Sequence, residues 1–206
     1  MATVLASLVV SVALIPSQGK AEPIGEKKVV MIVAQRNFRD EELEEPKAIL
    51  EKNGIKVTIA SSSKDIAIGM LGATIKPNML ISEIKVEEYD AIIFVGGQGA
   101  SYYWNDPTAH KIVKQAIEKG KIVAAICIAP VTLANARILK DKKATVWPSE
   151  ADKLTEKGAI YTGIKVEVDD NIITAVGPEQ AEEFGEAIVK ALTDVTRRSE
   201  EGCGCG

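Results

Sequence analysis

A cysteine that follows a buried strand is the residue of this sequence best placed for nucleophilic chemistry. The apolar segment 122–126 ends at Cys127, and small residues and Pro130 then begin a helix. A sharp strand-to-helix turn of this kind, a nucleophile elbow, projects a side chain above the carboxyl edge of a sheet. The helix N-terminus is expected to lower the pKa of the thiol, and the backbone N–H groups that follow it suit an oxyanion. The local sequence leaves one alternative open, an inert cysteine in the core.

Two further segments are expected to reach the same edge of the sheet. The strand 91–95 runs into the glycine-rich loop 96–99, where glycines permit close backbone approach and free N–H groups. This loop lacks the spacing of a nucleotide-binding fingerprint. The first helix begins with the acidic residues 40–42. Most of them are expected to be solvated and favoured there by the helix dipole, while one could point at the Cys127 thiol.

Short apolar runs alternate with amphipathic helices along the chain, which predicts a doubly wound α/β fold. The runs are continuously apolar, as parallel strands buried on both faces require. Strands are predicted at 29–34, 56–60, 91–95, 122–126, 144–147, 166–168 and 172–175, a small hairpin at 66–77, and helices at 40–53, 107–119, 128–138 and 179–192. We therefore expect one domain, residues 26–194, with a mostly parallel sheet and helices on both faces.

The two ends of the chain differ from this domain. Residues 1–25 contain an apolar run at 4–15 that is too short to span a bilayer as a helix. The segment is interpreted as a signal or anchor without the usual preceding positive charges, or as an apolar segment that packs on the domain or on a partner subunit. A cytoplasmic location is favoured, and export or membrane contact would depend on this segment. The polar tail 195–206 is expected to be flexible, and Cys203 and Cys205 in it make an incomplete metal site.

Composition narrows the classes of function. The chain of 206 residues has a net charge of −4, which counts against nucleic acid as a partner. Three cysteines cannot build a disulfide scaffold in a chain of this length, and a single histidine excludes a multi-histidine metal site. Neither a cofactor nor a metal is indicated, and the expected partners are a small-molecule substrate and a further copy of the chain.

Several motifs, in this order along the chain, resemble the DJ-1/PfpI superfamily, which has a flavodoxin-like, class I glutamine amidotransferase-like fold. The resemblance covers about residues 27–194, and the segments that carry it are 38–46, 89–97, 124–127 and 176–178. It implies a homodimer or a larger homo-oligomer.

The resemblance also implies a set of site residues. Cys127 matches the reactive thiol of the family, and Glu42, four residues before Pro46, matches the glutamate that hydrogen-bonds this thiol. The N–H groups of Gly97 and Ile128 correspond to the oxyanion hole of the family.

The chain departs from the family in its histidines. Members that resemble intracellular peptidases carry histidine directly after the cysteine, where this chain has Ile128. Members of the DJ-1 branch often carry histidine at the position of Trp147, and an indole has no basic nitrogen. The single histidine, His110, lies on the flank of its helix, and we interpret it as a boundary residue that could reach the rim of the site or a neighbouring subunit.

The leading interpretation is a Cys127-dependent enzyme that acts on small reactive carbonyls or oxidants, of the glyoxalase or deglycase type. A protonated Glu42 would share its proton with the sulfur and act as acid and base. The alternatives are a cysteine peptidase or amidase, and a non-catalytic chaperone or redox-sensing member of the family. The aromatic residues 102–104 are expected to line the pocket or to pack at an oligomer interface.

Overall fold

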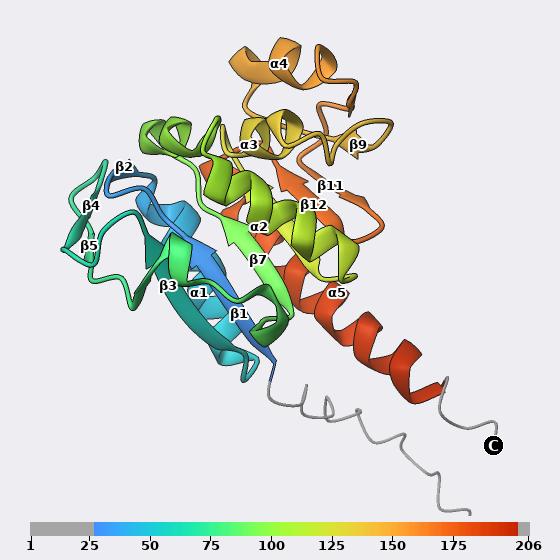
Figure 1. Cartoon of the computed structure of the whole chain (residues 1–206), viewed down its shortest axis with the longest axis horizontal. Helices are drawn as coiled ribbons and strands as arrows, with labels where there is room; N and C mark the ends of the chain where they lie inside the picture. The colour runs from blue at the N-terminus through green and yellow to red at the C-terminus, as the bar shows by residue number, and fades with distance from the viewer. Residues whose placement is uncertain (1–26, 202–206) are drawn as a thin grey trace, which may run out of the picture.

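The computed structural model describes residues 27–201, and their side chains up to residue 194. Its main sheet has seven strands in the order β11-β12-β8-β7-β1-β3-β6 (Figure 1). These strands are β11 (Val166–Asp169), β12 (Ile172–Ala175), β8 (Ile122–Ile126), β7 (Ala91–Phe94), β1 (Lys28–Ile32), β3 (Lys56–Ser61) and β6 (Met79–Leu80). All neighbouring pairs are parallel except β11 and β12. The predicted mostly parallel sheet is therefore confirmed.

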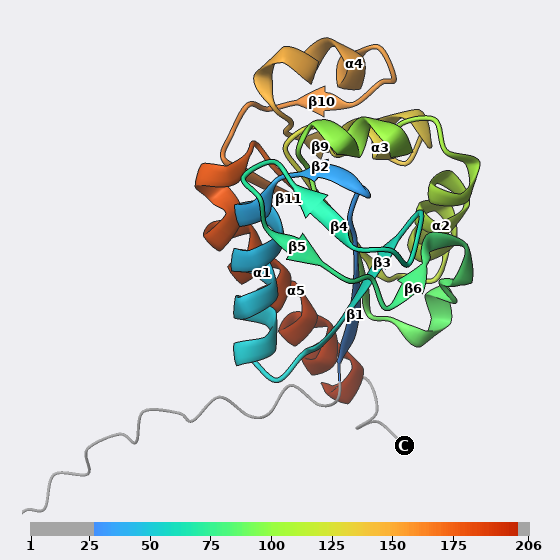
Figure 2. The same cartoon turned by 90° about the vertical axis from the view of Figure 1, so that its left-hand side faces the viewer.

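Helices cover both faces of this sheet. Helices α1 (Asp40–Lys52) and α5 (Ala181–Glu201) lie on one face, and α2 (Pro107–Glu118) and α3 (Pro130–Asn135) lie on the other (Figures 1 and 2). Because successive side chains of a strand point to opposite faces, the two faces have separate cores. In β1, Val29 and Met31 pack in the core with α1 and α5, while Val30 and Ile32 pack in the core with α2 and α3. The doubly wound architecture follows from this alternation.

Shorter elements complete the fold. A small sheet contains β2 (Arg36–Phe38), β4 (Ala67–Gly69) and β5 (Thr74–Ile75), and another contains β9 (Lys143–Ala144) and β10 (Ile160–Tyr161). The remaining helices are α4 (Ala151–Thr155) and the 3₁₀ turns η1 (Ile81–Glu83), η2 (Val86–Glu88), η3 (Gln98–Tyr103), η4 (Pro148–Glu150) and η5 (Pro178–Gln180). Strands β2, β6 and β10 and helix α4 were not predicted, because two to five residues are too few to show a hydrophobic period.

The hairpin predicted at 66–77 is present as the antiparallel pair β4 and β5. It is attached to the first turn of α1 by Asp40, whose carboxylate accepts hydrogen bonds from the backbone N–H groups of Leu71 (2.9 Å) and Ala73 (2.7 Å). Asp40 is only 5% exposed and Glu42 is fully buried, so the expectation that most of the acidic residues 40–42 are solvated is wrong. Gly69 faces this carboxylate so closely that a Cβ atom would lie 2.5 Å from Oδ1.

Three predicted elements differ in their bounds. The strand predicted at 144–147 ends at Ala144, because the N–H of Trp147 bonds the carbonyl of Cys127 instead of a ladder partner. The helix predicted at 128–138 is limited to α3, since Arg137 has a φ of 67°. The helix predicted to end near residue 192 continues to Glu201.

The predictions for the two ends of the chain fall on residues that the structure does not describe. The apolar segment 1–25 lies before the first described residue, and Cys203 and Cys205 lie after the last one. Between residues 27 and 201, no helix combines the length and the apolar character needed to cross a bilayer.

Candidate functional site

Cys127 occupies a sharp turn at the carboxyl end of β8. Its φ is 63°, a left-handed conformation that is uncommon for a residue with a side chain and strained in most contexts. Two backbone hydrogen bonds hold the turn: the Cys127 N–H donates to the carbonyl of Ala175 at 3.0 Å, and its own carbonyl accepts from the N–H of Trp147 at 2.9 Å. The side chain is half-buried. This is the backbone geometry that a nucleophile elbow requires.

The glycine loop after β7 brings a second element against this turn. A Cβ atom on Gly96 would collide with the Glu42 carboxyl group and would lie 2.5 Å from the Cβ atom of Cys127. Gly96 therefore packs against both the acid and the thiol, and only a residue without a side chain fits there. Gly97 has a φ of 89°, and a side chain on it would collide with the backbone N atom of Arg39.

The Glu42 carboxyl group is fully buried at the start of α1. Neither of its oxygens has a hydrogen-bond partner of regular geometry. Burial raises the pKa of this carboxyl group to about 8, although the nearby Cys127 thiol, the charge of Arg39 and the Gly96 N–H each lower it. Glu42 therefore holds its proton near neutral pH and is placed to donate it.

The Cys127 thiol does not have the lowered pKa that its sequence position predicts. Burial, and after it the ionised Glu42 carboxylate, raise this pKa to about 12, while the Gly97 and Ile128 N–H groups lower it. The helix effect is weak because α3 has only six residues and begins three residues later, at Pro130. When one of two buried acids in contact has lost its proton, its negative charge disfavours ionisation of the other. Glu42 and Cys127 therefore titrate as a coupled pair.

The four site residues predicted from the sequence line one cavity of about 230 Å³. These residues are Cys127, Glu42, Gly97 and Ile128, and the rest of the wall is formed by Arg39, Met70, Gln98, Trp147 and Pro178. Sequence reasoning did not identify Met70, which the β4–β5 hairpin brings to the cavity from a distant part of the chain. Most of these additional side chains are apolar, so the cavity suits a small molecule with a short apolar substituent.

Trp104 lies outside the wall of the cavity and holds the carbonyl of Ile128. Its indole N–H donates to the Ile128 carbonyl at 3.0 Å. The Trp104 carbonyl accepts from His110 Nε2 at 2.8 Å and from Asn135 Nδ2 at 2.9 Å. His110 is thus occupied by a structural hydrogen bond, and it does not line the cavity that contains Cys127.

The other two aromatic residues of this segment have different surroundings. The Tyr103 hydroxyl is buried and donates to the carbonyl of Val33 at 2.9 Å, so this side chain belongs to the core. Tyr102 is 62% exposed. Of the residues 102–104, only Trp104 supports the cysteine cavity, and it does so from outside the wall.

Trp104→Phe removes the indole N–H while it keeps an aromatic ring. The Ile128 carbonyl then loses its hydrogen-bond partner and the backbone at Ile128 is held less firmly, so the Ile128 N–H stabilises the thiolate less, and the apparent pKa for Cys127 alkylation is expected to rise. Alkylation rates from pH 6 to pH 10 measure this effect, with Tyr102→Phe as the control. An alkylation profile that is unchanged in Trp104→Phe would contradict this role.

Comparisons of sequence and of structure relate this chain to one group of known proteins. The chain matches the family model described as "DJ-1/PfpI family" over residues 27–191. It is 44% identical over 189 residues to an uncharacterised protein of Methanocaldococcus jannaschii, covering 90% of this chain and 92% of that one. It is 32% identical over 144 residues to a glutathione-independent glyoxalase of Caenorhabditis elegans, covering 70% and 77% of the two chains.

Two further similarities extend this relationship to a named deglycase and to a solved structure. A protein named as a deglycase in Pyrococcus abyssi is 28% identical over 163 residues, which cover 79% of this chain and 98% of that one. The crystal structure of a ThiJ/PfpI domain protein from Brachyspira murdochii is 33% identical, has a TM-score of 0.80, and is matched over 82% of this chain and 99% of that one. Since the family model matches most of the chain and the fold agrees, this protein belongs to the DJ-1/PfpI family.

Proposed function

We propose that this protein is a cysteine-dependent enzyme that converts small reactive carbonyl compounds, with 2-oxoaldehydes such as methylglyoxal as the preferred class. The observation that carries the proposal is the contact between the buried Glu42 carboxyl group and Cys127, beside the N–H groups of Gly97 and Ile128. It combines a nucleophile, a proton donor and acceptor, and two oxyanion donors in one small cavity.

The reactive form of the pair holds one proton between the two groups. The sulfur of Cys127 adds to the aldehyde carbon, while Glu42 gives its proton to the aldehyde oxygen, which yields a hemithioacetal. The Glu42 carboxylate then takes the proton from that carbon and returns it to the neighbouring carbon, while the hydroxyl proton moves from the first oxygen to the oxygen of the neighbouring carbon, which gives a thioester of a 2-hydroxy acid. Water cleaves the thioester and restores the one-proton pair. Overall, methylglyoxal and one water give lactate and a proton, so no external oxidant or reductant is consumed.

The named relatives support the same class of substrate. One is named a deglycase and another a glutathione-independent glyoxalase, and both names refer to carbonyl chemistry on small groups. The small and largely apolar cavity is consistent with a short carbonyl compound.

A cysteine peptidase or amidase is less well supported, because such enzymes need a base beside the thiol. Ile128 and Trp147 line the cavity without a basic nitrogen, and His110 donates to the Trp104 carbonyl outside it. The non-catalytic alternative, a chaperone or redox sensor, and the predicted homo-oligomer stay predictions.

The proposal is tested by incubating the protein with methylglyoxal and following lactate formation by NMR, with Cys203 and Cys205 replaced by serine. We expect lactate to form, with a rate that rises from pH 6 to about pH 8 as the pair loses its first proton. Cys127→Ala is expected to reduce this rate about 1,000-fold or more. Cleavage of peptides in place of methylglyoxal would favour the peptidase, and oxidation of Cys127 without any turnover would favour the redox sensor.

A further inference from the structure

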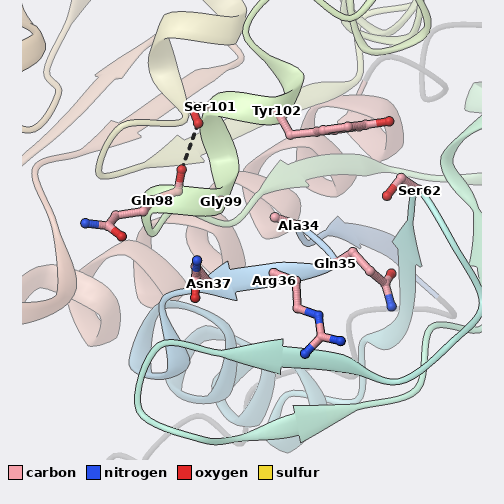
Figure 3. A pocket seen from close by; sticks show the side chains of 9 residues that line it. All are labelled: Ala34, Gln35, Arg36, Asn37, Ser62, Gln98, Gly99, Ser101 and Tyr102. Carbon is pink, nitrogen blue, oxygen red and sulfur yellow. Dashed lines mark hydrogen bonds between the residues drawn. The ribbon is translucent and has the colours of Figure 1, made fainter.

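A second cavity, of about 480 Å³, shares Gln98 with the cysteine cavity. Figure 3 shows the side chains that line it. We call it the Arg36 groove; its lining consists of Ala34, Gln35, Arg36, Asn37, Ser62, Gln98, Gly99, Ser101 and Tyr102. Gln98 lines both cavities, and the segment from Arg36 to Arg39 passes from one to the other. The two cavities are therefore neighbouring compartments at the carboxyl edge of the sheet.

The Arg36 groove carries a positive charge without a matching acid. Within residues 27–194, Arg36 makes no salt bridge, and no aspartate or glutamate lines the groove. By contrast, Arg39 in the cysteine cavity is paired with Glu41 at 2.8 Å. An exposed guanidinium in the lining of a cavity with several hydrogen-bond donors favours a carboxylate or another planar anion, which it binds through two parallel N–H groups.

The walls of the groove are held in place by other contacts. The Gln35 side chain is engaged on both sides, since Nε2 donates to the carbonyl of Asp65 at 2.9 Å and Oε1 accepts from the Ser61 hydroxyl at 3.0 Å. A Cβ atom on Gly99 would collide with the Arg36 carbonyl, so β2 and η3 approach each other at backbone distance. The shape of the groove is thus set before a ligand arrives, which reduces the entropic cost of binding.

Figure 3 shows how the lining side chains lie around this space. Tyr102 extends along one side, Arg36 and Gln35 lie on the opposite side, and Gln98 and Asn37 lie at one end. The end with Gln98 is the one shared with the cysteine cavity. A ligand whose reacting carbonyl lies at Cys127 would therefore extend past Gln98 into a compartment with an exposed aromatic ring and a free cation.

We propose that the Arg36 groove binds the carboxylate of a carbonyl substrate whose reacting end lies at Cys127. This inference rests on the proposed function and narrows its substrate class to carbonyl compounds with an anionic group several bonds from the carbonyl. Arg36 supplies the charge, and Gln98 and Tyr102 contact the connecting chain.

The test uses pairs of 2-oxoaldehydes of five to eight carbons, with and without a terminal carboxylate. The preference is the ratio of kcat/KM for the best carboxylate compound to kcat/KM for its neutral partner. Arg36→Gln is expected to lower this ratio about 10-fold, because one charge-assisted hydrogen-bonded contact is lost. Lys111→Gln removes an equal charge from the exposed side of α2 and is expected to leave the preference as in the wild type. Arg39→Gln is measured in parallel, because Arg39 is the other cation near the substrate.

The outcomes distinguish the groove from the proposed function. Two results would overturn the groove inference and leave the proposed function intact. One is turnover of both members of each pair with no preference for the carboxylate. The other is a preference that survives in Arg36→Gln and disappears in Arg39→Gln. If neither compound is turned over, the proposed function fails, and hexanoate binding measured by NMR decides the groove. Saturable binding that Arg36→Gln removes supports it, and the absence of saturable binding overturns it.

Discussion

The free energy of unfolding of the wild-type protein is expected to fall by about 3 kcal/mol between pH 5 and pH 8, and Glu42→Gln is expected to remove most of this fall. Folding raises the pKa of the Glu42 carboxyl group from 4.5 to about 8, so the folded state binds the proton more tightly than the unfolded state. Stability from this group is complete below pH 4.5 and is lost as the pH rises towards 8. Glutamine has no proton to lose, so this slope disappears.

The same variant is expected to lower turnover at least about 100-fold, because the proton donor and acceptor is gone. Urea unfolding at half-unit steps from pH 5 to pH 8 measures the slope, and lactate formation measures the activity. Glu44→Gln, at an exposed position of the same helix, is the control and is expected to keep both properties. A wild-type stability that stays flat over this pH range would show that Glu42 ionises freely.

Gly96→Ala is expected to reduce turnover below about 1% and to destabilise the fold by about 2 kcal/mol. The added methyl group would collide with the Glu42 carboxyl group and would lie 2.5 Å from the Cβ atom of Cys127. The acid and the thiol must then separate, or β7 must shift away from β8. Either change breaks the contact on which the coupled titration depends.

Gly120→Ala is the control for Gly96→Ala, because it lowers stability without a collision at the site. Gly120 has a φ of 66° and nothing within 4 Å of an added Cβ atom, so alanine there costs about 1 kcal/mol of backbone strain without a collision. Lactate formation and thermal unfolding are compared for both variants at a temperature where both are folded. Turnover by Gly96→Ala that equals turnover by Gly120→Ala would refute the close packing of acid and thiol.

The sequence was sufficient to predict where Cys127 and the glycine loop lie in the fold. Each follows a buried strand, so rules for strand ends in parallel sheets bring both to the same edge. The roles of the Gly97 and Ile128 N–H groups were inferred from the family resemblance. Glu42 was selected from three adjacent carboxylates through the family motif and not through its surroundings. Its burial, and with it the raised pKa values of Glu42 and Cys127, depends on how α1 packs against the loop at Gly96.

Features that depend on contacts between separate elements could not be predicted. Met70 reaches the cavity only because the β4–β5 hairpin folds back over the start of α1. The hydrogen bond between His110 and the Trp104 carbonyl joins residues six apart, one in a helix and one in the turn before it. Periodicity places His110 on a helix flank and says nothing of its partner.

The attachment of the hairpin to Asp40 affects how this cavity could change during evolution. The helix that carries the acid also holds the wall that contains Met70, so replacement of Asp40 would disturb the acid and the wall together. The tip of the hairpin, at Leu71 and Gly72, is exposed, and exposed tips tolerate insertions and substitutions. Homologues with larger or smaller substrates are therefore expected to differ in the length of this tip, while the carboxylate that anchors it is retained.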